Sequence, residues 1–201
     1  MGRVVDPYRP HVDADGKRTW SFPVQGDGRA LEAPAFPDDD GSADAGLAAA
    51  LAGRAASAGD RAAAGEAYLA CLDALTRARL LVPVVAVLGE VDVSPDGLRV
   101  EKDSDMAAVL LTGADGRTAL LAFSSAATMA AWDAAARPVG VPARVAAEAA
   151  LAEGASALVL DLAGPHRLVV EGDDLGALAS GWTLARVGEG PSATVGWVRP
   201  A

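Results

Sequence analysis

Serine side chains are the first groups in this chain to test for nucleophilic chemistry. Ser124 and Ser125 precede an expected helix, which is where the nucleophile of many hydrolases lies. The Gly-x-Ser-x-Gly elbow that exposes such a nucleophile is absent around them. A serine at this position also caps a helix by accepting a backbone N–H, and we favour that role. We therefore expect no catalytic residue here.

The histidines and the cysteine offer little for metal binding. The chain has two histidines, His11 and His166, and one cysteine, Cys71, and their separations match no zinc-ligand pattern. His166 follows a Gly-Pro pair and is expected on a surface loop. Cys71 falls on the apolar stripe of an expected helix, where a buried thiol is inert. We expect no metal and no cofactor.

An acidic stretch, Asp38–Asp44, brings four carboxylates close to a glycine. A calcium-binding EF-hand loop would need ligands at positions that hold Phe36 and Leu47 in this chain. Acidic groups at the start of a helix interact favourably with its positive end. The stretch is therefore predicted to cap the following helix, through Ser42 or Asp44.

The most polar stretch just before an expected strand is Glu101–Met106. Lys102, Ser104 and Asp105 are the best exposed candidates in it for a binding surface, because loops held by rigid strands often carry function. A solvated charge cluster at a strand end is the alternative.

The elements that would position these groups centre on Leu80–Ser125. Apolar runs at 80–88, 105–112 and 117–123 are separated by the turn-forming pairs Asp96-Gly97 and Asp115-Gly116. Val- and Leu-rich runs of this length predict strands. The second Asp-Gly pair predicts a tight antiparallel hairpin. An antiparallel meander is therefore expected.

Helical patterns flank this meander on both sides. The expected helices cover residues 45–52, 60–79, 126–132 and 142–153, and a last helix follows Asp173 or Asp174 as its cap. Further strands are expected at 155–160 and 167–170, and the tail carrying Trp182 and Trp197 is expected to add a strand pair or to stay loose. Together these features predict an α/β (α+β) fold, with a mainly antiparallel or mixed sheet of about five to seven strands flanked by helices.

The 201 residues suffice for one domain with extensions. We expect an N-terminal extension over 1–56, the main domain over 57–182, and a C-terminal tail or added strand pair over 183–201.

The formal charge of −10 disfavours nucleic acid and anionic membranes, which bind clustered Lys and Arg. No hydrophobic signal region opens the chain, and a single cysteine agrees with a reducing compartment, so we expect a cytoplasmic protein. The chain contains no Ile, no Asn and only two Lys, a bias typical of a GC-rich genome.

Three stretches, taken together, resemble the SseB family, named for enhanced serine sensitivity, in its form from high-GC bacteria. They are Ala35–Asp44 with the Leu-Ala-Ala-Ala-Leu helix after it, Leu80–Leu88 leading to Lys102–Met106, and Leu121–Trp132 with Ala136–Val139 and Ala157–Asp161. The chain has Phe123-Ser-Ser where the family often has Phe-Thr-Ser, which keeps a capping hydroxyl.

The resemblance implies an α/β fold and supplies no catalytic residues. It implies a shared surface, for which the candidates are Asp40, Gly41, Lys102, Ser104 and Asp105. We expect a non-catalytic protein that binds a protein partner through a sheet edge or the Lys102–Asp105 loop, a second copy of the chain being one alternative. The other alternative is a small-molecule or amino-acid binding protein, or an enzyme, with a pocket near Lys102 and Asp105.

Overall fold

The structure is a computed structural model that describes residues 36, 38–57, 59–87, 105–188 and 194–200, together with four short strands outside these ranges. The helices are α1 (Ala45–Ala56), α2 (Arg61–Leu75), α3 (Ala126–Trp132), α4 (Ala143–Ala152) and α5 (Gly172–Ala179). The strands are β1 (His11–Val12), β2 (Arg18–Thr19), β3 (Arg79–Val87), β4 (Val91–Val93), β5 (Arg99–Glu101), β6 (Asp105–Ala108), β7 (Leu110–Thr112), β8 (Thr118–Ala122), β9 (Arg137–Pro142), β10 (Ala157–Leu160), β11 (Leu168–Glu171), β12 (Thr183–Val187) and β13 (Thr194–Val198).

Two sheets form the centre of the fold. One has the strand order β11-β10-β8-β7, in which β8 and β10 run parallel and the other pairs are antiparallel. The second has the order β6-β3-β9 and is antiparallel. Leu81 and Phe123 exchange two backbone hydrogen bonds of 2.8 Å, which join the sheets at β3 and β8. The expected mixed sheet flanked by helices is therefore confirmed.

The hairpin expected at Thr112–Arg117 is present as the β7–β8 turn. Gly116 adopts a φ of +80°, which a residue without a Cβ tolerates, and the N–H of Gly113 donates to the carbonyl of Arg117 over 2.8 Å. The Asp96-Gly97 turn of the meander lies outside the described residues.

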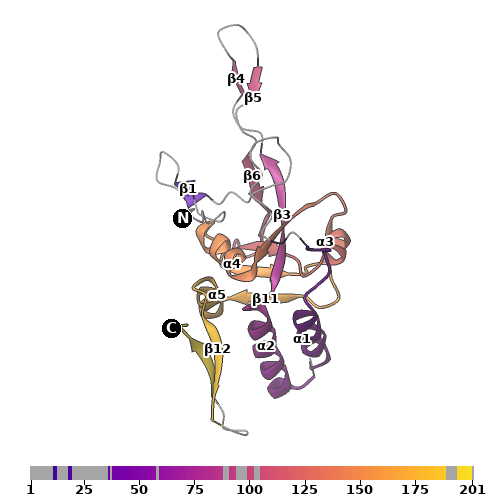
Figure 1. The fold of residues 1–201 in the computed structure, drawn as a ribbon, viewed down its shortest axis with the longest axis vertical. Coiled ribbons are helices and arrows are strands. Elements are labelled where there is room, and N and C mark those ends of the chain that lie inside the picture. The colour runs from indigo at the N-terminus through magenta and orange to yellow at the C-terminus, as the bar shows by residue number, and fades with distance from the viewer. Residues whose placement is uncertain are drawn as a thin grey trace.

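Helices cover the central sheet unequally (Figure 1). The alanine-rich helix α4 and the neighbouring α5 bury most of their inward side chains in the main core, against Leu120, Leu158 and Val170. α1 and α2 lie side by side and add Leu47, Leu51, Leu72 and Leu75 to the same core. α3 packs on the opposite face of the four-stranded sheet.

Polar side chains begin three of the helices. Asp44 accepts the N–H of Leu47 at α1, Asp60 accepts two backbone N–H groups at α2, and Ser125 forms a capping box with Thr128 at α3. Capping of the first and third of these helices was predicted from the sequence.

Sequence predictions about the ends of three helices are wrong. α1 continues to Ala56, past its expected end at residue 52. α5 is not capped by Asp173 or Asp174; both lie in its first turn, after the extended residue Glu171. α2 ends at Leu75, so Arg79 does not continue its apolar stripe and instead begins β3. There its backbone pairs with Pro142 of β9.

The C-terminal residues form a strand pair, β12 and β13, which is one of the two alternatives left open by the sequence and extends away from the body of the molecule beside α2 (Figure 1). Its inner side chains, Leu184 and Trp197, pack on the main core. In the described part of the chain, no helix is both long and apolar enough to cross a membrane.

Candidate functional site

The four-stranded sheet has two apolar faces, and only one of them is fully covered. Strand alternation sends Leu120, Leu158 and Val170 to the face under α4 and α5, where each is completely buried. The alternate residues face the other side. There, Leu121 is buried whereas Val169 is 38% exposed, so coverage of this second face is uneven.

Strand register arranges the second face in rows across the sheet. Leu111 on β7 lies opposite Ala119 on β8, and Ala119 lies opposite Ala157 on β10. In the next row Leu121 lies opposite Val159, and Val159 lies opposite Val169. Small alanine side chains therefore occupy the middle of the first row, and larger side chains flank them.

α3 covers the far end of this face. Met129 is buried among Leu81, Leu121 and Phe123, and the ring of Trp132 lies 5.5 Å from that of Phe123. Because α3 has seven residues, it reaches only part of the face. The row of Ala119 and Ala157, and the part of the next row formed by Val159 and Val169, line an open groove beside it.

This groove has a volume of about 340 Å³. Its floor is mainly apolar, and its open end is polar. The lining residues are Leu111, Thr112, Gly113, Asp115, Arg117, Thr118, Ala119, Ser156, Ala157, Val159, Val169 and Glu171.

A small network of charges borders the groove. Arg117 donates to Asp115 over 2.7 Å and to Glu171 over 3.1 Å, which links the β7–β8 turn to the end of β11. The hydrogen bond from Arg117 holds the pKa of Asp115 below its ordinary value, and the same bond raises the pKa of Arg117. All three side chains are more than half exposed, so the network orients charge toward solvent and contributes little to stability.

Ser124 meets a buried carboxylate behind α3. Its Oγ donates to Oδ2 of Asp161 over 2.7 Å, and its N–H donates to Oδ1 over 2.9 Å. Neither residue is more than 3% exposed, so no substrate reaches the hydroxyl. The pair therefore fixes the loop after β10 against the start of α3. Ser125 supplies the predicted cap.

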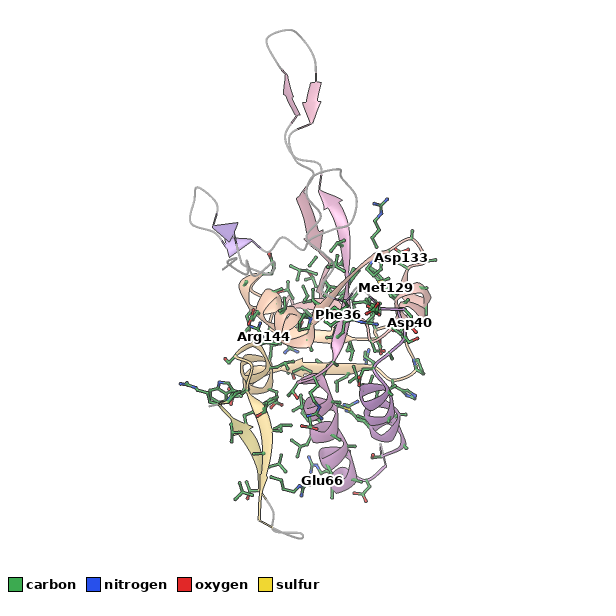
Figure 2. All side chains as sticks on the ribbon, viewed as in Figure 1. Phe36, Asp40, Glu66, Met129, Asp133 and Arg144 are labelled. Carbon is green, nitrogen blue, oxygen red and sulfur yellow. The ribbon has the colours of Figure 1, made fainter. Side chains whose placement is uncertain are left out.

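The acidic loop before α1 packs against the N-terminus of α3. The carbonyl of Gly41 accepts the N–H of Ala126 over 2.8 Å. Arg79, at the start of β3, holds this loop in place. It pairs with Asp39 and donates to the carbonyls of Ser42 and Ser124. Figure 2 shows the loop beside α3.

The candidate surface residues predicted from the sequence do not gather at one described place. Asp40 is exposed in the acidic loop, and the bond from the backbone N–H of Ser42 lowers the pKa of its carboxyl. Gly41 has a φ of +79° and contacts Ala126, which is a structural role. Asp105 begins β6, where its backbone pairs with Val87. Lys102 and Ser104 lie outside the described residues.

The groups tested first for chemistry occupy structural positions. Cys71 is fully buried, and burial raises the pKa of its thiol. His166 is half-buried rather than a plain surface residue, and its Nδ1 has no hydrogen-bond partner among the described atoms. No group of three or more His, Cys, Asp or Glu in the described residues is arranged to hold a metal ion.

Comparison with protein families gives one match. The family model for the SseB protein N-terminal domain matches residues 47–177. The chain belongs to the SseB family. No curated protein and no solved structure matches it.

All residues that line the groove in this SseB-family chain lie within the matched region. The acidic loop and the β12–β13 hairpin lie outside it. Sequence reasoning missed the groove. Its only sequence signal is a set of strands that are apolar on both faces, which indicates that both faces need a cover.

Proposed function

We propose that this SseB-family chain is a non-catalytic protein-interaction module that binds its partner through the open groove. The observation that carries the proposal is the incomplete cover of the second sheet face, where Val159 and Val169 remain accessible beside α3. An apolar patch with a polar, charged rim is typical of a protein-binding surface.

The chemistry of the described residues supports this class over a catalytic one. The hydroxyl of Ser124 is buried against Asp161, and the thiol of Cys71 is buried in the core. Neither group is accessible to a substrate. The groove itself contains no histidine or cysteine, and its only cation, Arg117, is paired with two carboxylates.

The test compares two lysine substitutions in matched exposed valines. Val169 lies in the groove and is 38% exposed, and Val198 lies on the C-terminal hairpin and is 43% exposed. Tagged wild-type chain, V169K and V198K are recovered from a native lysate at equal abundance, and the bound proteins are quantified. We expect one partner to be retained by the wild type and V198K and lost from V169K.

Equal recovery of every bound protein by V169K and V198K would contradict the use of the groove. Because both valines are exposed, each substitution is expected to change stability by only about 0.5 kcal/mol, which urea unfolding checks. A loss of binding then reflects the surface and not the fold.

The Lys102–Asp105 loop is a second proposed contact surface for the same function. Reversing both charges, with Lys102→Glu and Asp105→Lys, would leave the fold intact and weaken partner binding if the loop contributes. Unchanged binding of the double variant would remove the loop from the proposal. The proposal also includes a cytoplasmic location, which fractionation of cells checks.

Binding of a small molecule is the second candidate function. The volume of the groove, about 340 Å³, lies at the lower end of the range for ligand pockets. A thermal-shift screen with amino acids, including serine, tests it, because a ligand at 100 times its Kd adds about 2.7 kcal/mol of stability. A shift seen with the wild type and absent from V169K would favour this candidate, and no shift across a broad metabolite panel would exclude it.

A further inference from the structure

We propose that the occupant of the groove is one amphipathic α-helix of a partner protein, with apolar residues against Ala119 and Ala157 and with Lys or Arg on its flank toward Asp115 and Glu171. This inference rests on the proposed function and specifies the chemistry of the partner.

The groove lies on a sheet face, and this limits how a partner can bind. The middle of the floor is formed by β8, which is paired with β7 and β10, and by β10, which is paired with β8 and β11, so neither strand has an open edge. The ends of the sheet are β7 and β11. A partner that covers Ala119 and Ala157 therefore cannot form backbone hydrogen bonds with β8 or β10 and must pack side chains onto them.

The structure already shows how this face receives a helix. α3 places Met129 and Trp132, three residues apart, on Leu121 and Phe123. Val159 and Leu111 pack against the same apolar cluster and also line the groove. The groove therefore continues the surface on which α3 lies, and a second helix would pack beside α3 as helices in a layer do.

The four-stranded sheet as a whole is wide enough for one helix to lie on it. Four strands with a spacing of about 4.8 Å span roughly 14 Å, and a helix with its side chains is roughly 10–12 Å across. Ala119 and Ala157 lie opposite each other at the centre. Their small side chains leave a trough for the larger apolar side chains of an incoming helix.

The charge at the rim of the groove favours basic residues on one flank of the partner helix. Two carboxylates, Asp115 and Glu171, share one guanidinium, that of Arg117, so the rim carries excess negative charge. The whole chain carries a formal charge of −10. A basic flank is attracted to this surface, whereas a second copy of the chain is repelled by its own charge.

A displayed library of random 20-residue peptides tests the inference without assuming a sequence. The library is panned against the full chain at low salt, and peptides that also bind V169K are discarded. The remaining peptides must still bind V198K, which serves as the control. We expect enriched peptides with apolar residues at i, i+3, i+4 and i+7 and with Lys or Arg beside them. A synthetic copy of an enriched peptide should bind at least 10-fold more weakly to V169K than to the wild type. A second copy, in which the Lys and Arg residues of the peptide are replaced by Glu, should bind the wild type at least 10-fold more weakly than the first copy does.

Several results would overturn the inference. They are enrichment of short extended or acidic peptides, absence of any peptide that depends on Val169, and binding that survives a proline at the centre of the peptide, which breaks a helix. Self-association of the wild type in sedimentation, abolished by V169K and kept by V198K, would assign the groove to a second copy instead.

The lysate experiment separates this inference from the proposed function. If V169K loses a native partner but no helical peptide is enriched, the groove binds a protein of another structure, and only the inference about the helix fails. If V169K and V198K retain the same proteins, the proposed function fails as well.

Discussion

The hydroxyl of Ser124 donates to Oδ2 of Asp161 over 2.7 Å, and both residues are almost completely buried. Asp161 holds this position with a φ of +53°, which is uncommon for a residue with a side chain. Its other carboxylate oxygen accepts the N–H of Ser124. One carboxylate therefore satisfies both donors of Ser124 and ties β8 to the loop after β10.

Replacing this carboxylate should destabilise the fold strongly. In Asp161→Ala the buried N–H and O–H of Ser124 lose their acceptor, and the φ strain remains, so we expect a loss of about 3 kcal/mol. Asp161→Asn keeps an acceptor and should cost less. Urea unfolding measures both, with Asp133→Ala as the exposed control, expected to lose no more than about 1 kcal/mol. Equal losses in the two alanine variants would contradict the structural role.

Gly41 should tolerate no side chain, in contrast to a helical glycine. In Gly41→Ala the new Cβ would lie 3.0 Å from that of Ala126, at a φ of +79°. We expect a loss of at least about 1 kcal/mol. Gly65 in α2 has nothing within 4 Å of such a Cβ. Gly65→Ala should therefore stabilise the chain, by about 0.5–1 kcal/mol in thermal or urea unfolding.

The stability of the fold should depend on the forked guanidinium group of Arg79. One side chain, 11% exposed, reaches Asp39 and the carbonyls of Ser42 and Ser124. Lysine cannot span the three acceptors, so Arg79→Lys should cost about 1–2 kcal/mol and expose the acidic loop to limited proteolysis. The matched control is Arg77→Lys, because Arg77 is 69% exposed in its pair with Asp73. A change within about 0.5 kcal/mol is expected there.

Tyr68 should make the fold sensitive to alkaline pH. Burial and its hydrogen bond to Asp174 raise the pKa of the phenol well above its ordinary value. The folded state therefore keeps a proton that the unfolded state releases above a pKa of about 10. This contribution is complete below that pH and is lost as the pH rises further.

The measurement is the free energy of unfolding of the wild type and Tyr68→Phe between roughly pH 8 and 11, across the ordinary pKa of tyrosine. We expect a steeper decline in the wild type. Burial also raises the pKa of Cys71, so this thiol changes the stability with pH in the same direction as Tyr68. Both proteins should therefore be compared in a Cys71→Ala background. Parallel curves would show that the phenol of Tyr68 is not held protonated by the fold.

Local features of this chain followed from its sequence. Asp44 and Ser125 were recognisable as candidate capping residues, because a cap depends on a few neighbouring residues. The Asp115-Gly116 turn was recognisable for the same reason. These elements, in this order, are enough to predict a mixed sheet flanked by helices.

Contacts between distant residues could not be predicted in this way. Asp174 looked like a helix cap, yet its carboxylate accepts from Tyr68 and from Trp197, which two other elements bring to it. Arg79 looked helical until pairing with β9 placed it in a strand. In each case tertiary packing overrode a local preference of similar or smaller energy.

The sequence by itself determined which residues alternate between the faces of the sheet, because that depends only on the twofold period of a strand. Only the tertiary structure decided that Leu121 is covered and Val169 is exposed. The cover depends on how far α3 reaches across β8, β10 and β11. This helix of seven residues packs on Leu121 but reaches neither Val169, in the same row, nor the row of Ala119 and Ala157. The groove exists for that reason.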